Sequence, residues 1–260
     1  SEGVRILGNA VSNAVEAYQS DGVDVLRSSG ALVRGNRLVG NSWDGAAVIY
    51  SPDARVVDND LDRNGNNGLE VNGGADRAFV ADNRARDNAQ WGFAIGAATG
   101  VRVVGNAAAR NPNSGFLLFL LADSLVAGNR ALGNGVGFQL DGGPDGSHGV
   151  RLVRNRAIGN DDIGILVEDG ADGNTVADNE ASRNLGPEGA GILVANARDN
   201  VVVGNTANGN AFAGIWVLED EAGAAAGNHL GRNAANGNAG HGIDAVAGTV
   251  DDGGNRARGN

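Results

Sequence analysis

The chain has 260 residues, enough for one large domain or two small ones. Its 31 acidic and 20 basic residues give a formal net charge of −11, which argues against nucleic acid as a partner because phosphate binding needs a basic surface. Cysteine is absent, which excludes disulfides and thiolate ligands, and no apolar run approaches the roughly 18 residues of a membrane-spanning helix, so we expect no membrane span.

Asparagine recurs along the whole chain in pairs that are five residues apart, and successive pairs begin 23 to 27 residues apart. A glycine usually follows four residues after the second Asn and begins an alternating apolar segment, as in Gly68-Leu-Glu-Val. Asn9/Asn13 is a slightly shorter copy of the pair. The full pairs are Asn36/Asn41, Asn59/Asn64, Asn83/Asn88, Asn106/Asn111, Asn129/Asn134, Asn155/Asn160, Asn179/Asn184, Asn205/Asn210, Asn228/Asn233 and Asn255/Asn260.

Each repeat therefore contains three short segments of period two separated by Gly/Asn corners, a pattern that indicates strands rather than helices. We predict an all-β fold, a single-stranded parallel β-helix of about eleven coils that spans residues 1–260 as one domain. Inward Val, Ile, Leu and Ala should stack in columns. The corner Asn side chains should form ladders by bonding to the Asn residues above and below, and Asn and Gly should supply the left-handed corner conformation.

These Asn-x4-Asn corners and Gly-[Ile/Leu/Phe]-x-[Val/Ile/Leu] strands resemble the right-handed parallel β-helix repeats of the pectate-lyase-like superfamily. The nearest subgroup is the carbohydrate-binding and sugar-hydrolase repeat, which includes NosD-like periplasmic proteins and mannuronan epimerases. The resemblance covers essentially the whole chain. It implies a right-handed coil, a secreted or periplasmic location and a polysaccharide ligand, but it does not define an activity because many activities share this scaffold.

Superposition of the glycine-led strands places Asp141 and Glu168 on the same outward column of adjacent coils, with their carboxylates about 5 Å apart. Asp145, His148 and Asp169 should lie nearby. Three interpretations are open: catalysis by Asp141, Glu168, His148 and Asp145 as general acids and bases; Ca²⁺ bound by Asp141, Glu168 and Asp169; or a solvated acidic face.

The same outward positions carry an apolar strip in the middle and C-terminal part of the chain, and a patch of this kind marks an interface or a ligand groove. The Trp216 ring could stack on a sugar. We therefore predict a substrate-binding surface of Trp216, Gln139, Leu166, Leu193 and Glu219. Alternatively a loop, a missing segment or a second subunit covers the strip. The strip consists of Leu117, Phe119, Leu166, Leu193, Trp216 and Leu218.

Three functional hypotheses remain. The first is a secreted or periplasmic protein that binds or acts on polysaccharide, as a lyase, an epimerase or a glycoside hydrolase if it is an enzyme. The second is a structural or assembly solenoid that self-associates through its open ends or its apolar strip. It is suggested by the absence of a capping segment, which also leads us to expect a longer precursor.

The third hypothesis is a NosD-like accessory protein. Its support is weak because His148, His229 and His241 are dispersed and the chain lacks Met and Cys, the soft ligands of copper. The enzyme subgroups fit incompletely as well. Lysine is absent, no Arg occupies the outward positions of the glycine-led strands, and the Asp-Pro-His motif of mannuronan epimerases is missing.

Overall fold

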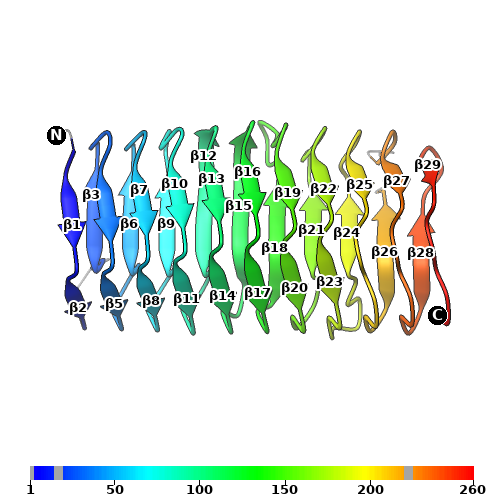
Figure 1. Ribbon diagram of the computed structural model, residues 1–260, viewed down its shortest axis with the longest axis horizontal. Helices are drawn as coiled ribbons and strands as arrows, with labels where there is room; N and C mark the ends of the chain where they lie inside the picture. Colours follow the sequence, from blue (N-terminus) through cyan, green and yellow to red (C-terminus); the bar gives the residue numbers. More distant parts are fainter. Residues whose placement is uncertain (1–2, 15–19, 220–224) are drawn as a thin grey trace.

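The computed structural model describes residues 3–14, 20–219 and 225–260. Over these ranges the chain winds into a solenoid in which each coil lies against the next from the N-terminal to the C-terminal end (Figure 1). The strands form three sheets that run along the solenoid, and every pairing between neighbouring strands is parallel. The predicted all-β parallel β-helix is confirmed, and the eleven strands of the first sheet match the predicted number of coils.

The first sheet contains, in spatial order, β1 (Arg5–Leu7), β4 (Leu32–Arg34), β7 (Arg55–Val57), β10 (Phe79–Ala81), β13 (Arg102–Val104), β16 (Leu125–Ala127), β19 (Arg151–Val153), β22 (Thr175–Ala177), β25 (Val201–Val203), β27 (His229–Gly231) and β29 (Val250–Gly253). The second sheet contains β2 (Ala10–Ser12), β5 (Arg37–Val39), β8 (Asp60–Asp62), β11 (Arg84–Arg86), β14 (Ala107–Ala109), β17 (Arg130–Leu132), β20 (Arg156–Ile158) and β23 (Glu180–Ser182).

The third sheet is built from the glycine-led segments and carries the longest strands, which face the candidate site described below. Its strands, from the N-terminal end, are β3 (Val23–Leu26), β6 (Ala46–Ile49), β9 (Leu69–Asn72), β12 (Phe93–Thr99), β15 (Ser114–Ala122), β18 (Val136–Asp141), β21 (Ile165–Glu168), β24 (Ile192–Ala195), β26 (Ala213–Leu218) and β28 (His241–Ala245).

The core is a set of columns of like residues, because the parallel register places each inward side chain directly above its equivalent in the previous coil. Phe93, Phe116 and Phe138 are fully buried and stack with ring centroids 4.8 and 4.6 Å apart and nearly parallel planes. This spacing equals the distance of about 4.8 Å between paired strands. The coil repeat therefore brings aromatic rings to contact distance without any adjustment of the backbone.

Two Asn ladders hold the corners on either side of the second sheet. Asn106 shows the arrangement: its Oδ1 accepts from the backbone N–H and Nδ2 of Asn83 at 2.9 and 3.0 Å, and its Nδ2 donates to Asn129 Oδ1 and to the Val80 carbonyl. The amide is thus satisfied inside the protein. The first ladder comprises Asn9, Asn36, Asn59, Asn83, Asn106, Asn129, Asn155, Asn179, Asn205, Asn233 and Asn255. The second comprises Asn41, Asn64, Asn88, Asn111, Asn134, Asn160, Asn184, Asn210, Asn238 and Asn260.

The predicted pair Asn228/Asn233 is wrong. Asn233 pairs with Asn238 across its coil, while Asn228 belongs to a short third ladder with Asn174 and Asn200 at the corner between the third and first sheets. The error has a simple cause. Asn228 and Asn233 flank the three-residue strand β27, so they have the same spacing of five as a true pair on either side of the second sheet.

The left-handed corner residue is the one just before the ladder Asn. In many coils it is Gly, as predicted, for example Gly105 with a φ of 70°. The ladder Asn does not take this role, and in other coils Asp or Arg does, as in Asp82 with a φ of 56° and Arg110 with a φ of 55°. Where this residue is not Gly, its side chain points outward and can form ion pairs along the solenoid. Arg110 Nε lies 2.7 Å from Asp87 Oδ1, and this pairing lowers the pKa of Asp87.

The glycines that begin the third-sheet strands are required by close packing. A Cβ at Gly92 would lie 2.6 Å from the carbonyl oxygen of Gly115 and 2.9 Å from Asn111 Nδ2. The second Asn ladder therefore runs directly against these glycines, which explains why an Asn is followed by a Gly four residues later in most coils.

We expect Asn111→Ala to destabilise the protein by about 3 kcal/mol, because it leaves the buried backbone N–H and Nδ2 of Asn88 without their acceptor. The free energy of unfolding in denaturant measures this. Asn113→Ala is the matched control: Asn113 is exposed, outside the ladders and bonded only at the surface to Gln90 through its side chain, so its loss should cost less than about 0.5 kcal/mol. Equal costs for the two variants would contradict this role of the ladder.

Candidate functional site

The outward columns of the third sheet have the register that the sequence predicts. Asp141 at the end of β18 is the direct partner of Glu168 at the end of β21, and Gln139 pairs with Leu166 one step earlier. Glu168 is held by a short chain of hydrogen bonds, in which Ser114 Oγ donates to Gln139 Oε1 at 2.5 Å and Gln139 Nε2 donates to Glu168 Oε1 at 2.8 Å. Burial raises the pKa of Glu168, and the negative charges of Asp141 and Asp169 act in the same direction.

The remaining acidic and basic candidates are more dispersed. Asp145 lies on an exposed loop after β18, and Asp141 Oδ1 accepts from the Gly143 N–H at the start of that loop. His148 returns to pair with Ala122 at the far end of β15, away from Glu168. Asp169 follows β21 and is exposed. The structure thus brings Asp141 and Glu168 together and places His148 beyond the loop.

The expectation of an exposed apolar strip is wrong for its central members. Leu166 and Leu193 are only 8% and 7% exposed, because they pack in a second small apolar cluster on the outside of the sheet. Ile163 and Phe212, which precede β21 and β26, fold over this face. Trp216 is half-buried and its ring meets Phe212 edge-to-face at 5.0 Å. Of the predicted substrate-binding residues near this cluster, only Glu219 is exposed.

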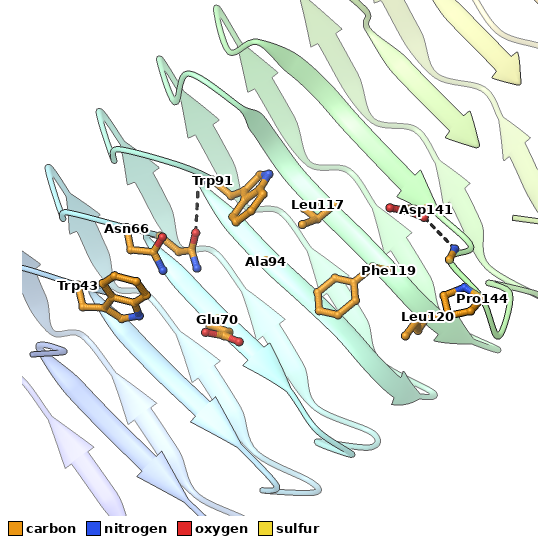
Figure 2. A pocket seen from close by; sticks show the side chains of 12 residues that line it. Trp43, Asn66, Glu70, Trp91, Ala94, Leu117, Phe119, Leu120, Asp141 and Pro144 are labelled. Atoms are coloured by element: carbon orange, nitrogen blue, oxygen red, sulfur yellow. Dashed lines mark hydrogen bonds between the residues drawn. The ribbon is translucent and has the colours of Figure 1, made fainter. Parts of the chain in front are cut away.

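A groove of about 560 Å³ crosses the N-terminal half of the third sheet instead, from β6 to the loop after β18 (Figure 2). The half-buried rings of Trp43 and Trp91 stand two coils apart, with Glu70 on the strand between them. Phe119 and Asp141 continue the groove toward the C-terminal end. Its lining comprises Trp43, Asn66, Asn67, Glu70, Trp91, Ala94, Leu117, Phe119, Leu120, Asp141, Gly143 and Pro144.

A second hollow of about 660 Å³ adjoins the groove at its N-terminal end and shares Trp43 and Glu70 with it. We call it the acidic hollow, because Asp21, Asp24 and Asp44 line it together with Glu70. None of these carboxylates has a basic neighbour among the residues that line the hollow.

Asp44 is the unusual member of this group, since its side chain is buried at 1% exposure. Its Oδ1 accepts from the Asn67 N–H at 2.8 Å and from Asn66 Nδ2 at 2.9 Å, whereas its Oδ2 receives no N–H or O–H donor among the described residues. Burial, together with the nearby Glu70 carboxyl and the charge of Asp21, raises the pKa of Asp44 to about 8 against the opposing effect of the hydrogen bond from the Asn67 N–H. Asp44 therefore holds a proton at neutral pH, and that proton can be shared with Glu70.

The tryptophans of the groove were not predicted as site residues. They lie in the corner between the second Asn ladder and the glycine-led strand, where period-two alternation gives no inward or outward assignment. A usable signal was present nonetheless. Trp43 follows Asn41 and Trp91 follows Asn88 within three residues, so the repeat alone places both rings at the same corner.

The described residues do not fit a bound copper ion. No three His, Asp or Glu side chains among them come together in a metal-binding arrangement. His148, His229 and His241 belong to separate coils, and Met and Cys are absent from the chain. Ca²⁺ binding by Asp141, Glu168 and Asp169 stays a prediction from the sequence. Among the described residues no helix has the length and apolar character needed to cross a membrane.

The fold and the groove define a parallel β-helix protein with a solvent-facing groove on its third sheet. The sequence matches the family model described as periplasmic copper-binding protein (NosD) over residues 2–147, and the model of the right handed beta helix region over residues 145–234. The first match covers more than half of the chain, so the chain belongs to the NosD family. The resemblance inferred from the Asn corners is thereby confirmed. No curated protein matches the sequence.

Solved structures with the same fold include two epimerases and a tailspike protein. A double mutant of the periplasmic alginate epimerase AlgG aligns with a TM-score of 0.82 and 15% identity, over 99% of this chain and 69% of that one. The A-module of the Azotobacter vinelandii mannuronan C-5 epimerase AlgE4 gives 0.65 and 17%, over 93% and 75%. The Dettilon tailspike protein gives 0.63 and 12%, over 95% and 62%. At these identities the likeness establishes the fold alone.

We expect the folded protein to lose stability as the pH rises from about 4 to 8, in part through Asp44. Its pKa is raised from 3.8 to about 8 in the folded state, so over this window the folded protein binds more protons than the unfolded chain. Asp44→Asn should remove this component, because an amide keeps the oxygen acceptor for Asn67 and offers an N–H to Glu70.

Melting temperatures at pH 5 and pH 8 measure this effect. The fall in melting temperature between the two pH values should be smaller for Asp44→Asn than for the wild type. Asp145→Asn, which removes an acid from an exposed loop, should leave the fall unchanged. An unaltered fall in the Asp44 variant would show that Asp44 is ionised in the folded protein throughout this range.

Proposed function

We propose that the protein binds a polysaccharide in the groove between Trp43 and Pro144 and that it works outside the cytoplasm, in the periplasm or as a secreted protein. The observation that supports this most directly is the pair of Trp rings on the same corner, two coils apart, with a carboxylate between them. Sugar rings have apolar faces that pack on aromatic rings and hydroxyl edges that bond to carboxylates and amides. The groove offers both kinds of contact.

The length of the groove suits a chain rather than a single sugar. Four strand spacings separate β6 from β18, or about 19 Å along the solenoid. Trp43 and Trp91 lie about 10 Å apart along that direction, close to the length of two sugar units in an extended chain. Asn66, on the coil between them, contributes an amide side chain to the groove. A linear glycan that runs along the solenoid would therefore contact the Trp43 ring, the Asn66 amide and the Trp91 ring in turn.

The location rests on the family. The NosD model is described as periplasmic, and so is the alginate epimerase among the structural neighbours. Self-association through the ends or the outer apolar cluster remains a separate hypothesis. We favour the glycan-binding function, because Leu166, Leu193 and Trp216 already pack against neighbouring side chains of the same face.

We expect Trp43→Ala and Trp91→Ala each to weaken glycan binding by at least about tenfold, since each removes a ring that carries a large part of the contact area. Titration calorimetry with the best glycan from a panel of neutral, acidic and basic polysaccharides measures the loss. Trp216→Ala is the matched control, because it removes the same side chain from the same sheet outside the groove. If Trp216→Ala alone weakened binding, the site would lie where the sequence placed it.

A second candidate function is catalysis at Asp141 and Glu168. The observation that favours it is the raised pKa of Glu168, which is held by Gln139 and lies next to Asp141 in the same column. A carboxyl group with a raised pKa keeps its proton to a higher pH and can then act as a general acid.

If the wild type depolymerises or modifies the glycan it binds, Glu168→Gln should reduce turnover by at least about a hundredfold, because it cannot supply a proton. Its binding constant should change little. Product formation by reducing-end assay and affinity by calorimetry separate the two effects. Turnover equal to that of the wild type would remove Glu168 from the chemistry.

A further inference from the structure

The acidic hollow contains a buried carboxyl oxygen that receives no N–H or hydroxyl donor from the described residues. This oxygen is Asp44 Oδ2; Oδ1 of the same carboxyl accepts two N–H groups, and the carboxyl shares its proton with that of Glu70. Asp21 Oδ1 accepts the Asp44 N–H at 2.9 Å, so it is fixed beside this carboxyl. A cationic ligand that donates N–H groups to this oxygen would replace the shared proton and allow the buried Asp44 carboxyl to ionise against a positive charge.

The surroundings of Asp44 favour a donor with positive charge. Asp21, Asp24 and Glu70 line the same hollow, so the local potential is negative. Trp43 lies at the boundary between the hollow and the groove and presents an aromatic face, to which a cation is attracted. Tyr50 lines the hollow as well, but the Arg27 guanidinium already stacks over its ring at 5.5 Å.

An organic ammonium fits this combination better than a metal ion. The described residues contain no arrangement of three metal-binding side chains, and a hard metal ion gains most from oxygen ligands. An ammonium group donates three hydrogen bonds to carboxylates and also gains from the Trp43 ring.

Because the hollow opens into the groove at Trp43 and Glu70, we propose that it binds the free ammonium group of an amino sugar within the glycan chain, which makes the preferred ligand a de-N-acetylated, cationic polysaccharide. This inference rests on the proposed function, since it assumes that a glycan lies in the groove. It adds the chemical class of the glycan. A uronate polymer would bring its carboxylates against Glu70, Asp44 and Asp21, whereas an amino sugar supplies N–H donors to Asp44 Oδ2 when this carboxyl releases its proton.

The test uses two chito-oligosaccharides of equal length, one N-acetylated and one de-N-acetylated, titrated by calorimetry into the whole protein at pH 6. We expect the wild type to bind the de-N-acetylated oligomer at least about tenfold more tightly, as charge-assisted hydrogen bonds of this kind provide. Binding should also release a proton from Asp44, since a nearby ammonium favours its ionised form. Repeating the titration in buffers of different ionisation enthalpy measures the number of protons released on binding.

Asp44→Asn should reduce the ratio of the two affinities toward one and remove the proton release, and Glu70→Gln provides a second variant with the same expected loss of preference. Asp244→Asn is the matched control for net charge: Asp244 lies on the same outward column as Glu70 but near the C-terminal end, so it should leave the ratio unchanged.

The possible failures are distinguishable. Equal affinities for the two oligomers in the wild type would overturn this inference and leave glycan binding in the groove intact. A preference that survives in both site variants, or that falls equally in Asp244→Asn, would show general attraction of a cation to an acidic protein and would also overturn it. Failure of every glycan to bind would refute the proposed function together with the inference.

Discussion

The Asn side-chain amides at the corners are the contacts on which the rest of the structure depends. A primary amide carries an acceptor and two donor hydrogens, so one Asn per coil can accept from the coil on one side and donate to the coil on the other without a break. Asp would lack the donors and would place a charge in the interior. The ladder also accepts the backbone N–H of the neighbouring Asn, as Asn111 does for Asn88, and so satisfies a group that strand pairing leaves free at a corner.

Because the ladders hold successive coils in register, the number of a residue in the sequence determines its position along the solenoid. Residues 24 positions apart lie about 4.8 Å apart if their coils have equal length. Trp43 and Trp91 become neighbours in one groove in this way, although neither needs a contact with the other. Longer coils disturb only the exposed loops. The segment from Asp141 to His148 takes seven steps where Phe119 to Ala122 takes three, and the extra chain forms the wall of the groove at Pro144.

The sequence predicts the direction of a side chain well where the residue lies in a strand, and less well where it lies at a corner. The pairing of Asp141 with Glu168 followed from counting after each glycine, because alternation gives every strand residue a definite side. Residues before the glycines have no such rule. Ile163 and Phe212 cover Leu166 and Leu193, and Trp43 and Trp91 line the groove, all from corner segments whose direction depends on φ and ψ angles that composition does not specify. For the same reason the sequence did not predict that Asp82, and not its neighbour Asn83, adopts the left-handed conformation.

The acidic groove does not favour the anionic polymers that two of the structural neighbours are named for. Two of them are named as epimerases of alginate or mannuronan, which are polymers of uronic acids, yet fold similarity at 15 to 17% identity carries no information about side chains. In this chain the groove and the adjoining hollow present Glu70, Asp141, Asp21 and Asp24, and lysine is absent from the sequence. A polyanion would have to enter against this field, and no lining residue of the groove is an arginine. The charge of the groove is therefore set by the outward residues of a few coils, whereas the Asn ladders and the apolar columns leave it undetermined.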